Sequence, residues 1–540
     1  MTANSETAPA PRAGGATLVL LTLAAGQFLM TLDSSVMNVS IATVAEDVGT
    51  TVTGIQGAIT AYTLVMASLM IVGAKIGAMI GRKRAFALGC VIYGCGSFTT
   101  SISQSLPVLL FGWSFLEGVG AALIMPAIVA LVAGNFPQAR RPAAYGMVAA
   151  AGAVAVAVGP LIGGFCTTYF SWRWVFAGEV VVVLGILLLT RRIADAPVEK
   201  RPKLDLVGAV LSALGLGLFV FGVLRTSEWG WIAPKPDGPS WANLSPSIWL
   251  ILAGLFVIWV FFRWQARMEK SGREPLIRPA MLRNKQLSGG LLMFFFQFLI
   301  QAGVFFVVPL YLSVCLGLSA LDTGVRLLPL SLTLLVAALG IPRVFPNISP
   351  RLVVRLGLFA LLLGAVVLLA GLDPDAGPEI VFVPMLLIGL GIGALASQLG
   401  AVTVSAVPDD ESPEVGGIQN TATNLGASLG TALAGSFLFA TLATSFATNI
   451  QQSSAIPDRV KAEAQVELAG GVPFISDADL KEALDEAGAR SSTADAALEA
   501  YQEARIVGLR SALAILALIA LLALFLAQRI PKTQPHAAPT

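Results

Sequence analysis

The chain has 540 residues, of which 56% are hydrophobic and only 12% charged, and its mean hydropathy is +0.80. Soluble globular domains carry about 25% charged residues, so this composition excludes a soluble protein and indicates a polytopic membrane protein. The net charge of +2 gives no support for nucleic-acid binding, because the basic residues form short clusters between apolar runs and not one patch.

A helix needs roughly 20 residues to cross about 30 Å of hydrocarbon at 1.5 Å per residue. By that measure about fourteen stretches of the chain are transmembrane helices, and together they predict an all-α fold. The stretches are 17-41, 53-73, 85-103, 107-133, 143-166, 174-190, 205-225, 247-265, 288-313, 323-345, 353-371, 379-405, 415-446 and 507-528.

Lysine and arginine are unevenly divided between the loops on the two sides of these helices. One side carries Arg82, Lys83, Arg84, Arg140, Arg141, Arg191, Arg192, Lys200, Arg201, Lys203, the run from Arg263 to Lys285, Arg343, Arg351, Arg355, Arg529 and Lys532. The short loops of the other side carry almost nothing basic beyond Arg173, Arg225 and Lys235. Because cytoplasmic loops hold the excess of Lys and Arg, the first side is predicted to be cytoplasmic. The even number of helices then places both termini in the cytoplasm of a multi-pass protein in the plasma (inner) membrane.

A stretch rich in charge and turn residues divides the chain into two halves. We expect a cytoplasmic tail (1-16), an N-terminal six-helix bundle (17-192), two spacer transmembrane helices (205-265), a cytoplasmic connector (266-287), a C-terminal six-helix bundle (288-528) with an extracytoplasmic loop (449-505), and a cytoplasmic tail (529-540).

The extracytoplasmic loop contains signals for helix ends. Ser476 and Asp479 have the spacing of a capping box, and Gly488 is a stop signal. We expect a short helical hairpin packed on the outer face, although a solvated connector fits the same pattern.

The first apolar stretch contains an acid. On a helix, Gly26, Met30, Asp33 and Met37 share one face, since they are four, three and four residues apart. A charge inside the bilayer is costly and therefore indicates a function by default. This face places a carboxylate between flexible thioethers, which suits a proton or a cation beside an adaptable apolar surface. The alternative is that Asp33 caps local backbone or pairs with a structural partner.

Two further acids lie in later stretches. Glu117 is in the middle of a predicted span, one turn after Trp113, where lipid and an indole disfavour its ionised form and allow proton exchange. Glu179 is closer to the outer end of its helix, within reach of helix-end backbone groups, so it is as compatible with a structural role as with a functional one.

The ninth stretch carries a stripe of aromatic and amide side chains. Its members are Phe294, Gln297, Phe298, Gln301 and Phe305. Together with Met30, Met37 and Trp113 they are our candidates for lining a substrate cavity, because the amides need water or polar partners. An ordinary helix-helix seam is the alternative explanation of the stripe.

The fifth stretch contains the sequence GPLIGG, in which Gly159, Pro160, Gly163 and Gly164 follow a run of small residues. Proline interrupts the hydrogen-bond ladder of a helix and glycine allows close helix approach. The segment is therefore suited to bending or to tight packing.

Six motifs in this order resemble one transporter family. They are LDSSVMNVSI (32-41), ITAYTL (59-64), GAKIGAMIGRKR (73-84), LEGVGAALIMP (116-126), GPLIGG (159-164) and SWRWVF (171-176). With about fourteen spans, the chain resembles the fourteen-spanner drug:proton antiporter branch of the major facilitator superfamily. The resemblance extends over the whole chain in topology, while the motifs lie in its first half.

The resemblance implies a major facilitator fold of two six-helix bundles plus two extra helices. It also implies proton-driven export of amphipathic compounds by alternating access, with Asp33 as the acid of the first helix and GPLIGG as the antiporter motif. It assigns a cytoplasmic gating loop to Gly73, Gly77, Gly81, Arg82 and Arg84.

The chain departs from the family pattern at three places. Ala78 stands where the gating loop usually has an acid, and Ser114 where the fourth helix usually has an arginine, with Glu117 at a position where glutamine is common. Glu179 begins the segment of the sixth helix that typically reads Asn-Val-Pro. We therefore infer that Asp33 and Glu117 share the proton coupling, with Glu179 as a third candidate.

The expected function is proton-coupled export of drugs or antibiotics. Export of a specific endogenous lipid or secondary metabolite is the first alternative, because a fold does not fix the substrate. A non-transporting membrane receptor or scaffold is the second, although a scaffold need not keep acids in lipid. An enzyme is disfavoured because no nucleophile and base pair, nucleotide cradle or metal-ligand set is recognisable. We expect no cofactor and no metal, and the expected partners are an amphipathic small molecule, protons and the bilayer, bound by a monomer.

Overall fold

The computed structural model describes residues 13–136, 140–195, 204–235, 238–407, 412–454, 456–458, 461, 472–487 and 489–534. Thirteen helices in these ranges are long and apolar enough to cross a membrane. A further helix, α4, has comparable length and packs among them, so the predicted all-α membrane fold is confirmed.

The long helices fall into two bundles and a separate pair. The N-terminal bundle consists of α1 (Ala13–Val39), α3 (Val52–Ile80), α4 (Arg82–Ser101), η1 (Leu110–Glu117) continued by α6 (Gly118–Asn135), α7 (Arg141–Tyr169) and α8 (Arg173–Thr190). The C-terminal bundle consists of α12 (Lys285–Leu310) continued by η4 (Tyr311–Cys315), α13 (Ala320–Val344), α14 (Pro350–Gly371), α15 (Phe382–Val404), α16 (Ser412–Gln452) and α19 (Ser491–Leu526). The pair is α9 (Leu206–Leu224) and α11 (Pro246–Lys270).

Short elements connect these helices. They are α2 (Ile41–Asp47), α5 (Leu106–Leu109), α10 (Thr226–Trp229), η3 (Met281–Arg283), η5 (Pro378–Val381), α18 (Asp477–Glu486) and η7 (Ala527–Arg529). The predicted spans agree with the long helices to within a few residues, except at the ends of α3, α11, α16 and α19, which extend beyond the apolar stretches.

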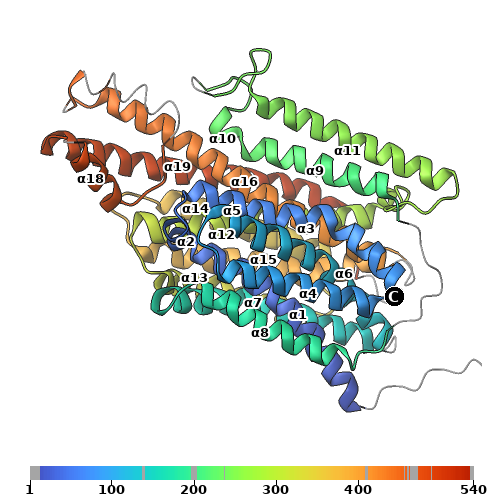
Figure 1. The fold of residues 1–540 in the computed structure, drawn as a ribbon. Coiled ribbons are helices and arrows are strands. Elements are labelled where there is room, and N and C mark those ends of the chain that lie inside the picture. Colours follow the sequence, from blue (N-terminus) through green and yellow to red (C-terminus); the bar gives the residue numbers. More distant parts are fainter. Residues whose placement is uncertain are drawn as a thin grey trace, which may run out of the picture.

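The two bundles contact each other through α3 with α16 and through α7 with α13. The pair of extra helices lies along one flank, where α9 packs on both α3 and α16, and α11 packs mainly on α9 (Figure 1). Figure 1 also shows α18 at one end of the molecule, which we term the α18 end. The turn between α3 and α4 lies at the opposite end, termed the basic end.

Side-chain caps define the starts of many of these helices. Thr51, Asp205, Ser245, Asn284 and Ser319 each accept a hydrogen bond from a backbone N–H in the first turn of the following helix. Such a cap contributes about 1 kcal/mol to a helix start. The polar residues at the span boundaries therefore set where the helices begin.

The hairpin predicted in loop 449–505 can be followed only in part, because residues 459–460 and 462–471 lie outside the described chain. The capping box of Ser476 and Asp479 is present and starts α18, which is a single helix. The remainder of the described loop is largely formed by the ends of α16 and α19, which project beyond the bundles. Arg505 on α19 pairs with Asp477, and Tyr501 donates to the backbone oxygen of Pro473 at 2.6 Å, so α19 holds α18 in place. Gly488 and residues 1–12 and 535–540 of the tails lie outside the described part of the chain.

Candidate functional site

The structure brings the three predicted membrane acids together. Asp33 on α1, Glu117 at the end of η1 and Glu179 on α8 are buried, and carboxylate oxygens from the three lie within 4.8 Å of one another. We term this group the acid cluster. None of the ion pairs in the described part of the chain involves these acids.

Asp33 is held by an indole. Trp113 Nε1 donates to both carboxylate oxygens of Asp33, at 2.7 and 2.8 Å. The ring of Tyr62 on α3 stacks on Trp113, with ring centroids 5.2 Å apart and an interplanar angle of 14°. The predicted alternative of a local backbone cap therefore does not describe Asp33, and the indole that the sequence places beside Glu117 serves Asp33 instead.

The two glutamates have hydroxyl neighbours from α4. Ser97 donates to Glu179 Oε2 at 3.1 Å and Tyr93 to the same oxygen at 3.4 Å, while Thr100 Oγ1 lies 3.3 Å from Glu117 Oε1. Among the described residues no partner satisfies Glu117 Oε2 or Glu179 Oε1. Glu179 is thus tied to side chains of α4 and not to the helix-end backbone groups that the sequence offered.

A π-helical segment positions Trp113 and Glu117. Residues Leu110–Glu117 form η1, in which the backbone has the wider turn of a π-helix. Such segments recur at functional sites because they change the direction of side chains relative to an α-helix. Here the turn lies between α4 and α3, and Ser114 donates to the backbone oxygen of Ala58 at 2.8 Å. Ser114 therefore acts in helix packing where the family pattern has an arginine.

The acid cluster lies in the half of the N-terminal bundle nearer the α18 end. Asp33 is six residues before the end of α1, and Glu179 is six residues after the start of α8. At 1.5 Å per residue both are about 9 Å from the helix ends. The cluster is therefore inside the predicted span and not at its surface.

The predicted cavity residues share one apolar core with the neighbours of the acids. Met30, Met37 and Trp113 belong to the same core cluster as Phe294 and Phe305 of α12, and Phe298 packs against it. Gln297 is buried and its Oε1 has no partner among the described residues, whereas Gln301 is half-buried. A buried amide oxygen without a partner fits a polar contact to a substrate, and the lining role of these residues stays a prediction.

The GPLIGG segment lies where α7 meets both α1 and the other bundle. A Cβ built on Gly159 would lie 2.5 Å from Ser35 Cβ, and one on Gly163 would lie 2.9 Å from Val36 Cα. On the opposite face, a Cβ on Gly164 would lie 2.5 Å from the backbone oxygen of Ala320 on α13.

Pro160 completes this contact between the bundles. Its backbone oxygen would lie 2.3 Å from a Cβ built on Gly324 of α13. The absence of side chains at these glycines allows α1, α7 and α13 to touch through their backbones. The segment therefore packs tightly, as its composition indicates.

The predicted gating loop forms the turn between α3 and α4. Gly81 has φ of 104°, in the region that favours glycine, and Arg82 donates to the backbone oxygen of Ala74 at 2.7 Å. The backbone N–H of Lys83 donates to Asp195 Oδ1 at 3.1 Å, so an acid after α8 contacts this turn. Gly77 lies against Arg82, and Gly73 lies against the backbone of Ala122 on α6. Arg84 is exposed.

The connector bridges the two bundles at the basic end. Lys75 on α3 donates to the backbone oxygen of Pro275 at 3.1 Å and lies 3.7 Å from Glu274. Arg278 of the same connector pairs with Glu414 at the start of α16, with 3.6 Å between Nε and Oε2. These contacts lie near the position where Ala78 replaces the usual acid.

Two six-helix bundles with a buried acid cluster in one of them and a further helix pair along one flank are the architecture of a secondary membrane transporter. The chain belongs to the Major Facilitator Superfamily, because the model of that family matches residues 23–431. The resemblance seen in the motifs is thereby confirmed.

Individual relatives agree with this assignment. The chain is 31% identical over 450 residues to a probable actinorhodin transporter of Streptomyces coelicolor, covering 81% of this chain and 74% of that one. It is also 31% identical over 432 residues to the puromycin resistance protein pur8 of Streptomyces alboniger, covering 79% and 82%.

Solved structures share the fold. A bacterial homolog of the human lysosomal transporter Spinster, in an inward-facing and unoccupied conformation, matches with a TM-score of 0.57 and 15% identity, covering 98% of this chain and 100% of that one. At this identity the likeness concerns the fold alone.

Four residues of the site were not predicted from the sequence. Tyr62 is part of the ITAYTL motif, so its position in a family motif was the available signal. Tyr93, Ser97 and Thr100 share one face of α4, at spacings of four and three residues, but polar residues at helical spacing give no indication of what they face.

Proposed function

We propose that this protein exports amphipathic small molecules from the cytoplasm in exchange for protons, by alternating access between its two bundles. The observation that carries the proposal is the convergence of Asp33, Glu117 and Glu179, buried and within 4.8 Å, with no cationic partner in the described chain. The basic end faces the cytoplasm in this proposal, in accordance with the positive-inside rule.

The acid cluster is suited to binding protons. Two ionised carboxylates 4.8 Å apart repel each other by about 3 kcal/mol even at an effective dielectric constant of 20. Without a lysine or arginine to offset that repulsion, three ionised groups are not tolerated together in a buried site. The cluster therefore holds protons when it is closed from water and releases them when a bundle movement admits water or a cationic substrate.

A continuous set of contacts links the acid cluster to the interface between the bundles. Asp33 and the residues Ser35 and Val36 lie on neighbouring turns of α1, and the latter two pack on Gly159 and Gly163 of α7. The same segment of α7 contacts α13 through Gly164 and Pro160. A shift of α1 that follows protonation of Asp33 would thus reach the C-terminal bundle through backbone contacts, which transmit displacement because packed interiors deform little.

The names of the relatives support the substrate class. One relative is a probable actinorhodin transporter and another is a puromycin resistance protein, so both names refer to a small organic compound. The apolar core around Met30, Met37 and the aromatic residues of α12 offers such compounds a flexible surface. Export of one specific metabolite is the second candidate, since a further relative is a tetracenomycin C resistance and export protein.

The test uses purified protein in proteoliposomes with an imposed pH gradient and ethidium as the amphipathic probe. We expect Asp33→Asn to abolish uphill ethidium transport, a loss of at least about 100-fold, because the group that binds the proton is removed while size and shape are kept. Asp322→Asn, at the exposed start of α13, is the matched control and should transport as the unmodified protein does.

Three outcomes are informative. If Asp33→Asn concentrates ethidium as well as the control does, Asp33 does not couple transport to protons. If a sodium gradient drives ethidium uptake and a pH gradient does not, the acid cluster binds a metal cation. If an uncoupler leaves ethidium accumulation in inverted vesicles unchanged, proton coupling is excluded altogether.

A further inference from the structure

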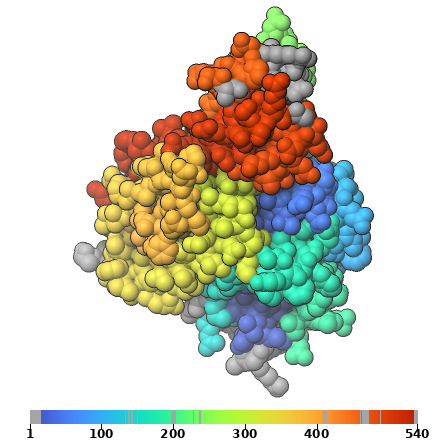
Figure 2. All heavy atoms as spheres, turned by 90° about the vertical axis from the view of Figure 1, so that its left-hand side faces the viewer, coloured from blue at the N-terminus to red at the C-terminus, as the bar shows by residue number. Residues whose placement is uncertain are grey.

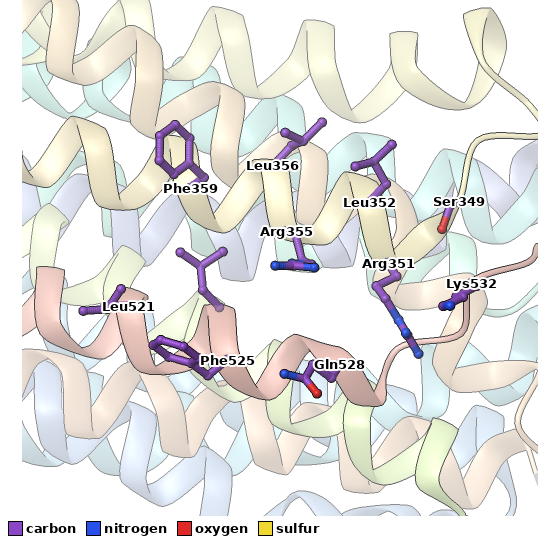
Figure 3. A pocket seen from close by; sticks show the side chains of 11 residues that line it. Ser349, Arg351, Leu352, Arg355, Leu356, Phe359, Leu521, Phe525, Gln528 and Lys532 are labelled. Carbon is purple, nitrogen blue, oxygen red and sulfur yellow. The ribbon is translucent and has the colours of Figure 1, made fainter.

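A groove on the outside of the C-terminal bundle combines positive charge with apolar surface. It lies at the basic end between α14 and the last turns of α19 and has a volume of about 770 Å³ (Figure 3). Arg351 and Arg355 come from α14, and Lys532 follows the last turn of η7. We propose that this groove binds one anionic phospholipid from the leaflet at the basic end.

The cations of the groove are available to a ligand. Arg351 uses its Nε to donate to the backbone oxygen of Ile530 at 2.7 Å. Arg355 and Lys532 are exposed and make no hydrogen bond or ion pair with any residue that the structure describes. Figure 3 shows Arg355 pointing from α14 toward α19, with Arg351 and Lys532 beside it near the end of the helix.

Among the described residues that line the groove there is no acidic side chain to pair with these cations. The sequence has no Asp or Glu from Phe345 to Leu372 or from Arg505 to Thr540, and the groove is lined by none. An unpaired arginine on a lipid-facing helix is costly. A phosphate group would offset that cost, because guanidinium binds phosphate through parallel hydrogen bonds.

The order of side chains along the groove matches the order of groups in a phospholipid. Lys532 and Arg351 lie at the edge of the membrane region, and Arg355 is one helical turn further in. Beyond them the groove is apolar, with Phe359 53%, Leu521 41% and Phe525 64% exposed. Basic sites between transmembrane helices above such apolar surface bind anionic lipid headgroups. The phosphate thus faces the cations while the acyl chains follow Phe359 and Phe525.

The geometry distinguishes this groove from other charged surface at the same end. Arg343 on α13 donates to the backbone oxygen of Leu339, and Lys270 ends α11, but neither lines the groove. Removing these two cations lowers the charge of the basic end by the same amount as removing Arg355 and Lys532. They therefore provide a matched control for a general electrostatic attraction to anionic membranes.

The experiment is native mass spectrometry of the full-length protein taken from nanodiscs that contain equal amounts of phosphatidylglycerol and phosphatidylethanolamine. We expect the unmodified protein and the control K270Q/R343Q to retain one phosphatidylglycerol in preference to phosphatidylethanolamine. The variant R355Q/K532Q should lose that preference by roughly tenfold, because each cation near an anionic surface strengthens the attraction. R355K should keep most of it, since the charge remains.

Several results would overturn the proposal. One is equal retention of the two lipids by the unmodified protein, and another is the same loss in the control as in R355Q/K532Q. A third is binding of inorganic phosphate alone, without lipid, because the site would then take a free anion. If R355Q/K532Q does not elute as a single species on size exclusion, the lipid preference of K532Q is measured instead. Lys532 lies after the last helix, so its loss leaves the helix packing intact, and an unchanged preference in K532Q would then overturn the proposal.

Discussion

The two ends of the molecule join the same bundles in different ways. At the α18 end the contact is made by backbone and small residues: a Cβ on Gly324 would lie 2.3 Å from the oxygen of Pro160, and one on Gly164 would lie 2.5 Å from that of Ala320. At the basic end a Cβ on Gly416 would meet Val129 at 3.5 Å, and one on Gly417 would meet Ala74 at 3.6 Å. The two bundles are therefore packed backbone to backbone at the α18 end, where no side chain would fit at these glycines. At the basic end they are separated by ordinary van der Waals distances. Figure 2 views the α18 end, where the two bundles meet along a seam.

The polar contacts between the bundles also differ between the two ends. Across the seam at the α18 end, Gln56 donates to the backbone oxygen of Thr431 at 2.8 Å and Ser428 to that of Thr60 at 3.0 Å, and all of these side chains are buried. At the basic end the connector makes the link through the Lys75–Glu274 and Arg278–Glu414 pairs, in which the glutamate side chains are 52% and 24% exposed. Exposed pairs contribute about 0–1 kcal/mol each and are screened by salt. Opening the α18 end therefore requires free energy to break close backbone contacts and buried hydrogen bonds. The acid cluster lies beside that end.

The largest effect is expected from Gly324→Ala. Its methyl group would overlap the backbone oxygen of Pro160, so α7 and α13 must separate, at a cost of about 1–3 kcal/mol to the closed form. We expect spin labels at positions 169 and 322, on a background without the four native cysteines, to move apart in electron–electron distance measurements. Residues Tyr169 and Asp322 are exposed at this end, so labels there are tolerated.

Gly417→Ala is the control for this prediction. The same methyl group at the basic end meets Ala74 at 3.6 Å, an ordinary contact, so the label distance at the α18 end should not change. If both alanine variants shift the distance equally, the proposed contrast between the ends is wrong. If neither does, the backbone contact at Gly324 does not hold the α18 end closed.

A smaller effect is expected from Gln56→Leu. The substitution removes one buried hydrogen bond between the bundles, and a net loss of about 1 kcal/mol would raise the population open at the α18 end roughly fivefold. Gln286→Leu is matched to it, because Gln286 donates to the backbone oxygen of Val402 at 2.8 Å within one bundle. Both variants should lower the melting temperature by a similar amount, but only Gln56→Leu should change the distance between labels 169 and 322.

The acid cluster beside the α18 end could be predicted from the sequence only in part. Apolar length predicts the helices, and the cost of charge in lipid singles out Asp33, Glu117 and Glu179 one at a time. Their convergence could not be derived, because they come from three helices whose mutual rotation depends on packing. The π-helical segment adds to this, since its Trp113 donates to Asp33 on another helix.

The projecting helices show a second limit. The last span was predicted to begin at 507, where the apolar residues begin, yet α19 starts at Ser491. Hydropathy marks the part of a helix that lies in lipid but not its end, and the Ala- and Glu-rich residues before 507 have high helix propensity. A similar argument explains why α16 continues to Gln452 beyond the predicted end at 446.

The smallest effect is expected from Lys75→Met at the basic end. It removes the 3.7 Å pair with Glu274 and the 3.1 Å bond to Pro275, and because the pair is partly exposed the change should be below about 1 kcal/mol, less than a fivefold shift between open and closed forms. The shift is measured as the rate of ethidium transport at 0.1 M and 1 M salt. High salt should make the unmodified protein behave like the variant, since screening removes the same attraction.

Lys270→Met is the control for this prediction. Its lysine lies at the end of α11, outside the bridge, so the salt response should not change. A loss of transport in Lys75→Met as large as that expected for Gly324→Ala would mean that the basic end is held as firmly as the α18 end, and the two ends would then differ in chemistry but not in strength.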